Sequence, residues 1–153
     1  MDLILWRHAE AQDPAEGQDD TTRVLTSRGE KQAARMAHWL DRQLPEGARV
    51  LISPARRCEQ TARALERKYK IRPELAVGGT VDQLLEAAQW PHGKATVLIV
   101  GHQPVLGQAI ARLRGLSASE CVVKRGAVWW LRNRERGALS QTVVVTVQSP
   151  EVM

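Results

Sequence analysis

Two histidines and several arginines follow the apolar segments of this sequence. Arg7 and His8 come directly after the first apolar run, Arg56 and Arg57 lie shortly after the second, and His102 follows the strongest run. Charged side chains are uncommon beside buried strands unless they have a partner or a function. In open α/β sheets, ligands bind at the carboxyl ends of the strands. If the three runs are neighbouring strands, these side chains converge on one crevice and predict a site for a tetrahedral oxyanion that also holds a nucleophile.

Short apolar runs alternate with amphipathic stretches, which is typical of an α/β fold. The stretch at 71–79 is expected to be a loop or a short strand. We expect one domain, residues 1–153, with three layers (α/β/α), a mostly parallel central sheet and a C-terminal antiparallel hairpin. The pattern predicts helices from residue 27 to near 45, from 54 to 69, over 81–90 and after 104, strands over 2–6, 49–52 and 96–100, and hairpin strands over 127–132 and 139–147.

Two helix starts carry capping signals. Ser27 followed by Glu30 matches a capping box for the first helix. Ser53 before Pro54 predicts an N-cap with proline at the first helical position, and small or apolar positions at helical spacing continue to Tyr69. The N-termini of the second helix and of the helix after residue 104 then face the predicted crevice. Their backbone N–H groups favour an anion there.

Composition is that of an ordinary soluble globular protein and excludes several classes. The chain has 153 residues, a net charge of +5 and 17 Arg against 5 Lys, which favours phosphorylated or acidic partners. No apolar run approaches the roughly 18 residues of a membrane-spanning helix, and the N-terminus lacks the basic region of a signal peptide. The two cysteines are distant and lack metal-ligand spacing. We expect a cytoplasmic protein with no metal, no cofactor and no membrane contact.

Four segments, taken in order, resemble the motifs of one enzyme family. The set resembles the histidine phosphatase superfamily (the phosphoglycerate-mutase-like phosphatases), and within it the small branch of SixA-type phosphohistidine phosphatases. Ala9 stands where the family usually has Gly, and alanine fits there if φ is negative. The segments are Arg7-His8 after the first strand, Leu25-Thr26-x-x-Gly29-x-x-Gln32-Ala33, Ser53-Pro54-x-x-Arg57-x-x-Gln60-Thr61-Ala62, and Gly101-His102-Gln103-Pro104.

The resemblance implies metal-independent hydrolysis through a phosphohistidine intermediate. His8 would attack phosphorus as a neutral imidazole, which the nearby arginines would keep neutral at pH 7. Arg7 and Arg57 would bind the phosphoryl oxygens, and His102, if protonated, would donate to another oxygen. Arg56 and Arg57 lie about 100° apart on a helix and cannot both point inward. The spacing does not choose between them, and the family pattern selects Arg57.

Three further residues are candidates for binding the substrate. This branch tends to carry an arginine before the second motif, here Arg23. Ser53, the predicted N-cap, is expected near the phosphate. Glu74 sits where larger family members place a proton-donating glutamate. Acids of the loop over 9–22 compete for that role, namely Glu10, Asp13, Asp19 and Asp20.

Three functions remain open from the sequence. The first is a phosphatase for phosphohistidine in a signalling protein, because a chain this short leaves little material to roof the site over a small metabolite. The second is a phosphatase for a small phosphate ester, such as a sugar phosphate or nucleotide. The third is a non-catalytic binding module for nucleic acid or acidic proteins. The dispersed arginines and the lack of a basic helix or binding motif disfavour nucleic acid.

Overall fold

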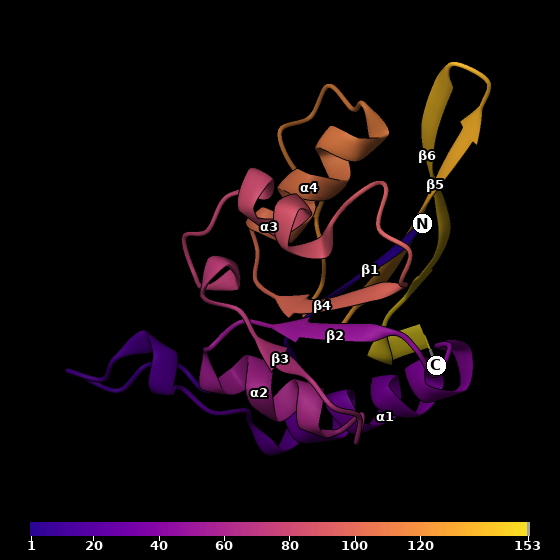
Figure 1. The fold of residues 1–153 in the computed structure, drawn as a ribbon. Coiled ribbons are helices and arrows are strands. Elements are labelled where there is room, and N and C mark those ends of the chain that lie inside the picture. Colours follow the sequence, from indigo (N-terminus) through magenta and orange to yellow (C-terminus); the bar gives the residue numbers. More distant parts are fainter. Residues whose placement is uncertain (153) are drawn as a thin grey trace.

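The computed structural model describes residues 1–152 and shows one six-stranded sheet between two layers of helices (Figure 1). The strands lie in the order β3-β2-β4-β1-β5-β6. Pairing is parallel between β1 and β4, β4 and β2, and β2 and β3, whereas β5 runs antiparallel to β1 and to β6. The predicted mostly parallel sheet with an antiparallel hairpin is confirmed. The strands are β1 (Asp2–Arg7), β2 (Arg49–Ile52), β3 (Lys70–Ile71), β4 (Val97–Gly101), β5 (Val128–Arg136) and β6 (Leu139–Gln148).

The alternation of side chains along the central strands builds two separate cores. Leu3 and Leu5 of β1 pack on one face with α3 and α4, whereas Ile4 and Trp6 pack on the other face with α1 and α2. Both faces of these strands are covered, which explains why their sequences are continuously apolar. The layers seen in Figure 1 follow from this division. The helices are α1 (Ser27–Gln43), α2 (Arg56–Arg63), α3 (Val81–Ala88) and α4 (Val105–Arg114), with 3₁₀ turns η1 (Asp20–Thr22), η2 (Pro73–Leu75) and η3 (Pro150–Val152).

Both predicted capping assignments are wrong. Helix α1 is capped by Thr26, whose hydroxyl accepts a hydrogen bond from the Gly29 N–H, and not by Ser27. Helix α2 begins at Arg56 behind Ala55, so its cap lies two residues after the one predicted at Ser53. The Ser53 hydroxyl contacts His102 and accepts from the Ala55 N–H, so it belongs to the turn ahead of α2 rather than to the helix cap.

Several boundaries also differ from those predicted. Helix α2 ends at Arg63, whereas the sequence pattern continues to Tyr69. The hairpin strands extend through the residues predicted as the turn and leave only residues 137–138 between them. The structure describes no helix in residues 1–152 that is long and apolar enough to cross a membrane.

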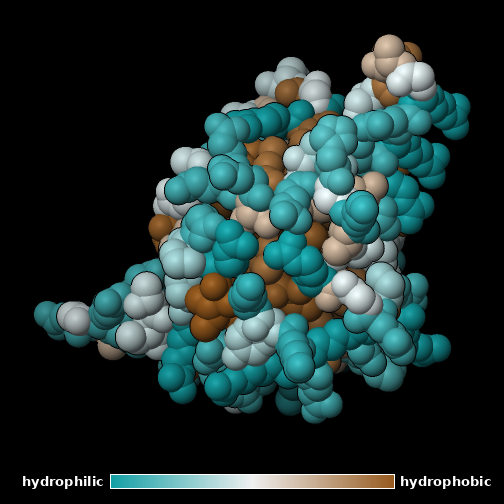
Figure 2. All heavy atoms as spheres, viewed as in Figure 1, coloured by the Kyte–Doolittle hydropathy of each residue, from teal (hydrophilic) through white to brown (hydrophobic). Residues whose placement is uncertain are grey.

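Residues 12–22 form an arm that stands off the body of the protein (Figure 1). The arm follows His8 by a few residues and contains η1. Every residue in this range is exposed, and the arm is hydrophilic in the space-filling view (Figure 2). Its base is tied to the body, because Gln12 donates a backbone hydrogen bond to Val24. The arm therefore holds its acidic residues beside the carboxyl edge of the sheet.

Candidate active site

Residues that follow three adjacent strands meet at one edge of the sheet. Arg7 pairs with Gly101 in the parallel ladder between β1 and β4. One step further, the His8 N–H donates to the Gly101 carbonyl, and the Ser53 N–H donates to the Val100 carbonyl. These bonds carry the ladder past the strand ends. His8, Ser53 and His102 are thereby fixed at the same edge.

Most of the sequence-predicted site residues lie around one hollow of about 430 Å³, which we call the histidine hollow. Four arginines and two aspartates surround two histidines there, so the lining carries an excess of positive charge. Of the predicted residues, Arg7, His8, Arg23, Arg57 and His102 contribute to the wall. The full lining is Arg7, His8, Ala11, Asp13, Asp20, Arg23, Arg57, Val77, His102, Gln103 and Arg125.

The His8 ring is held in one orientation by its own backbone. Its Nδ1 lies 2.8 Å from the carbonyl oxygen of Ala9, and a carbonyl only accepts, so Nδ1 carries the proton. The Nε2 lone pair then faces the Arg57 Nε, which donates to it over 3.4 Å. Ala9 is buried and its φ is not positive, so alanine fits where the family usually has glycine. The ring presents an unprotonated nitrogen toward Arg57.

Both histidines of the site are neutral. Burial lowers the pKa of His8 to about 3, and the charges of His102, Arg57 and Arg7 act in the same direction. Burial, together with the Arg57 charge, lowers the pKa of His102 to about 4. The ring centroids are 5.3 Å apart, so protonating one ring disfavours protonation of the other. A neutral imidazole is the nucleophilic form.

Arg57 is the buried arginine of α2, with 3% of its surface exposed, whereas Arg56 is exposed. Its guanidinium contacts both histidines, because Nε reaches His8 and Nη2 lies 3.5 Å from His102 Nδ1. The same Nη2 forms an ion pair of 2.9 Å with the Asp20 carboxylate. Arg23 contacts the other oxygen of that carboxylate over 2.9 Å. The two arginines thus already hold an oxyanion beside His8.

His102 is positioned by Ser53, which lies behind it rather than in the wall of the hollow. The Ser53 Oγ is 2.8 Å from His102 Nε2 and also accepts from the Ala55 N–H. Because Arg57 donates toward Nδ1, the proton of neutral His102 is on Nε2 and points at Ser53. A bound anion would favour the protonated form of His102. The Nδ1–H of that form would then be a further hydrogen-bond donor to the anion.

Arg7 carries a charge that no carboxylate in residues 1–152 balances within ion-pair distance. Its Nη1 donates to the Val123 carbonyl over 2.8 Å, and its buried Nε has no partner. Burial, together with the neighbouring Arg125 charge, lowers the pKa of Arg7, yet a guanidinium stays charged at neutral pH. A bound oxyanion would supply the missing partner.

The structure does not bring Glu74 into this arrangement. Glu74 lies in η2 and forms an ion pair with Arg72, outside the wall of the histidine hollow. Of the competing acids in the loop over 9–22, Asp13 and Asp20 line the hollow. Asp19 instead caps η1, and Glu10 bonds to the Thr26 hydroxyl. The acids nearest the histidines therefore belong to the arm.

Sequence reasoning missed Arg125 and the pairing of Asp20 with two arginines. Arg125 comes from the loop before β5, which reaches the site because Gly126 donates to the His8 carbonyl and Arg7 donates to Ala127. No local signal marks this approach, which depends on β5 pairing with β1. Gln103 could have been found, since it belongs to the fourth motif and also lines the hollow.

Two residues of the resembling motifs hold the loop that follows His8. Thr61 accepts a hydrogen bond from the Ala9 N–H, and Gln32 accepts one from the Glu10 N–H. Gly29 is required nearby, because a Cβ there would lie 2.0 Å from the Glu10 carbonyl oxygen. These contacts explain why the motif positions are polar or small although they do not reach the hollow.

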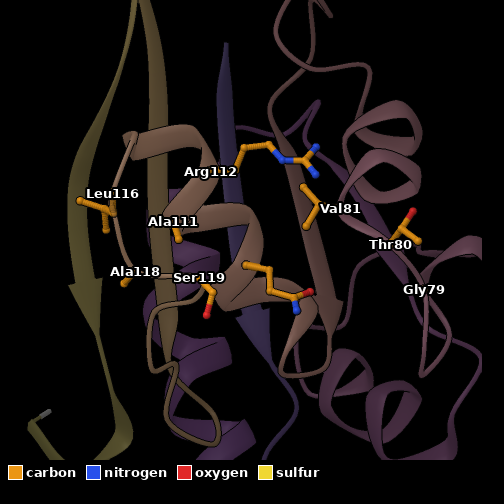
Figure 3. A pocket seen from close by; sticks show the side chains of 9 residues that line it. Gly79, Thr80, Val81, Ala111, Arg112, Leu116, Ala118 and Ser119 are labelled. Atoms are coloured by element: carbon orange, nitrogen blue, oxygen red, sulfur yellow. The ribbon is translucent and has the colours of Figure 1, made fainter.

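A second hollow, of about 460 Å³, lies between α3 and α4 and is lined by Thr80, Val81 and Arg112 among others (Figure 3). The Thr80 hydroxyl already caps α3, and Arg112 forms an ion pair with Asp82. No histidine contributes to its lining. Residues 1–152 contain no group of three or more His, Cys, Asp or Glu side chains that could hold a metal ion.

The low pKa values of the two histidines predict an acid-sensitive fold. The unfolded chain takes up protons at these rings below about pH 6.5, whereas the native protein does not, so stability falls as pH falls. At pH 5, each of the two rings lowers the free energy of unfolding by about 2 kcal/mol. Asp2 and Asp20 add almost nothing between pH 7 and pH 5, because aspartate takes up protons only at lower pH in either state. Burial raises the pKa of both carboxyls, but Arg132 and Trp130 at Asp2, and Arg57 and Arg23 at Asp20, outweigh burial and lower it.

Urea unfolding at pH 7 and pH 5 measures this loss of stability. We expect His8→Gln to lose less free energy of unfolding between these pH values than the wild type. His38→Gln serves as the control, because His38 is exposed on α1 and its replacement should leave the pH dependence unchanged. Identical pH dependence in His8→Gln and wild type would show that His8 is not held neutral by burial.

Comparison with known proteins identifies one family and several relatives. Residues 3–78 match the histidine phosphatase superfamily (branch 1). The chain is 33% identical over 121 residues to phosphohistidine phosphatase SixA of Escherichia coli (strain K12), covering 74% of each protein. It is 30% identical over 130 residues to a phosphohistidine phosphatase SixA homolog of Haemophilus influenzae, covering 75% of this chain and 78% of the relative. A solved structure of the protein histidine phosphatase SixA complexed with tungstate superposes with a TM-score of 0.83, at 28% identity over 99% of both chains.

Proposed function

We propose that this chain, which belongs to the histidine phosphatase superfamily, hydrolyses a phosphoryl group through a phosphohistidine intermediate on His8. The observation that carries the proposal is the orientation of His8. Its Nδ1 proton is held by the Ala9 carbonyl, and its Nε2 lone pair faces a hollow lined by four arginines. A neutral imidazole with a fixed tautomer is ready to attack phosphorus.

In the first step, the His8 Nε2 lone pair forms a bond to phosphorus while the bond to the leaving group breaks. The leaving atom keeps the electron pair and takes a proton. Arg57 and Arg7 bind the phosphoryl oxygens and offset the charge of the transition state. Positive charge develops on the His8 ring, and the Ala9 carbonyl stabilises it at Nδ1–H.

In the second step, water attacks the phosphorus of phosphorylated His8. The P–N bond breaks, its electron pair returns to Nε2, and inorganic phosphate is released. His102 acts in both steps by donating from Nδ1 to a phosphoryl oxygen when it is protonated. In both forms of the ring, Nε2–H donates a hydrogen bond to the Ser53 hydroxyl. Because the arginines and His102 bind the phosphoryl oxygens, the reaction needs no metal.

The proton for the leaving group comes from water in this proposal, and a carboxylate of the arm relays it. Asp13 and Asp20 both line the hollow, and both lie on the side that faces solvent. Burial raises the pKa of Asp20, but Arg57 and Arg23 outweigh burial and lower it. Asp20 therefore carries no proton while it contacts these arginines, and it can relay one from water only after a phosphoryl group has displaced it. Arg23 is assigned to binding substrate, because it shares the Asp20 carboxylate with Arg57.

We propose phosphohistidine in a protein as the substrate. The hollow lies at the carboxyl edge of the sheet beside an exposed arm, where a side chain on a protein surface can reach it. The similarity to phosphohistidine phosphatases SixA supports this substrate over a small phosphate ester. A sugar phosphate or nucleotide would be the substrate if the site serves metabolites instead.

The substrate class can be tested by comparing phosphate release from two sets of compounds. One set is a phosphorylated histidine-containing domain, and the other is a panel of sugar phosphates and nucleotides. We expect the highest kcat/KM with the phosphorylated domain, and unchanged activity in the presence of EDTA. Faster hydrolysis of any metabolite would overturn the proposed substrate. Salt-sensitive nucleic-acid binding without hydrolysis of either set would favour a binding module.

A further inference from the structure

A second groove adjoins the histidine hollow. It has a volume of about 400 Å³ and shares Arg7 and Arg125 with the hollow. It continues along the first half of α1 into a smaller depression. We call this surface the basic groove, and its positively charged residues are Arg7, Arg28, Lys31, Arg35, Lys124 and Arg125.

Positive charge in the basic groove comes from two segments far apart in the sequence. Arg28, Lys31 and Arg35 recur at spacings of three and four in α1, so they lie on one face of the helix. All three are exposed, as are Lys124 and Arg125 of the loop before β5. The face of α1 and this loop are thus two walls of one cationic channel that leads to Arg7.

Few acids balance this charge. The two in its lining are Glu10 and Glu151, and Glu10 is already bonded to the Thr26 hydroxyl and lies 3.4 Å from Arg125. Within residues 1–152, no carboxylate forms an ion pair with Arg28, Lys31 or Lys124, since none of the ion pairs of this part of the chain includes them. The groove is therefore complementary to a negatively charged ligand.

We propose that the basic groove binds an acidic segment of the phosphoprotein substrate, next to its phosphorylated side chain. This inference rests on the proposed function and names the kind of protein that the site selects. Because Arg7 and Arg125 belong to both surfaces, a chain with its phosphoryl group at His8 continues into the groove. Val122, 80% exposed in the groove lining, offers an apolar contact to that segment.

Two other ligands fit these observations less well. A small phosphate ester is accommodated by the histidine hollow and leaves the basic groove unused. A single-stranded nucleic acid would be expected to stack its bases on aromatic side chains. The groove has none in its lining, which consists of charged and amide side chains, Val122 and Pro150. An acidic polypeptide can be bound by the arginine and lysine side chains that line the groove.

Binding can be measured without catalysis, by fluorescence anisotropy of two labelled, unphosphorylated peptides. Both carry a central histidine, flanked by Asp and Glu in one and by Asn and Gln in the other. We expect the acidic peptide to bind the wild type at least about tenfold more tightly than the neutral one. The variant R28E/K31E should lose about tenfold in affinity for the acidic peptide, because two attractive charges become repulsive.

The matched control is K68E/K70E, which makes the same change in net charge at exposed lysines near β3. It should change the affinity for the acidic peptide by less than about threefold, since these lysines are outside the groove. If both double variants lowered the affinity for the acidic peptide equally, the effect would come from net charge alone, and the proposal would be overturned. Binding of an oligonucleotide that is lost in R28E/K31E, without preference between the peptides, would also overturn it.

An activity measurement separates this inference from the proposed function. Both peptides are phosphorylated on histidine, and the ratio of their kcat/KM values is compared between wild type and R28E/K31E. We expect the preference for the acidic peptide to collapse in the variant. Phosphate release from neither peptide by the wild type would refute the proposed substrate, while the anisotropy result would still decide whether the groove binds acidic chains.

Discussion

Replacing His8 with alanine is expected to lower the hydrolysis of an aryl phosphate by at least about 10,000-fold. His8 supplies the bond-forming electron pair, and His102 cannot replace it, because its Nε2 is turned away toward Ser53. The remaining arginines can still bind phosphate but have nothing to transfer it to. The measurement is the steady-state rate with p-nitrophenyl phosphate, using enough protein to detect residual turnover.

The same variant tests the covalent intermediate. Wild-type protein mixed with radiolabelled substrate and quenched in alkali should carry an acid-labile label, and His8→Ala should carry none. His38→Ala is the matched control, because it removes an exposed histidine from α1 and should keep both the rate and the label. A labelled His8→Ala protein, or one that retains its rate, would assign the nucleophile to another residue.

The position of His8 and His102 could be predicted because it depends on local patterns. Short apolar runs identified β1 and β4, and a parallel sheet places the carboxyl ends of its strands at one edge. Once these strands pair, the residues after them must lie together, as the register between Arg7 and Gly101 shows. The choice of Arg57 over Arg56 needed more, since helix geometry alone permits either to point inward.

The remainder of the site depends on contacts between distant segments. Arg125 approaches Arg7 only because β5 lies antiparallel to β1, and nothing near residue 125 indicates it. The ion pairs of Asp20 with Arg57 and Arg23 depend on how the arm folds back. Composition predicts the arm as a loop but gives no information on its direction.

Side-chain competition explains the errors in the helix starts. Ser53 has the sequence of an N-cap, yet its hydroxyl is used by His102. The same hydroxyl accepts from the Ala55 N–H in the turn ahead of α2, and Ala55 precedes the helix without a side-chain cap. A capping rule considers one segment at a time, whereas this hydroxyl serves a residue 49 positions away.

Removing the Arg57 side chain is expected to be the second most damaging change. Arg57→Ala should lower kcat/KM for an aryl phosphate by about 1,000-fold, because one guanidinium contacts His8, His102 and the Asp20 carboxylate and is placed to bind an oxyanion there. We expect kcat to fall and KM to rise, since the group binds the phosphoryl oxygens in the ground state and in the transition state. The Asp20 carboxylate already accepts from Arg57 and Arg23, and we expect the phosphoryl oxygens to take its place there.

Arg57→Ala should also shift the acidic limb of the pH–rate profile upward. The Arg57 charge lowers the pKa of both histidines in addition to burial, so its loss makes them easier to protonate. Arg56→Ala is the matched control, because it removes the same charge from the neighbouring, exposed position of α2. If Arg56→Ala reduces kcat/KM as much as Arg57→Ala, the effect comes from net charge. If Arg57→Ala loses activity without the upward shift, the arginine binds phosphate but does not help to keep the nucleophile neutral.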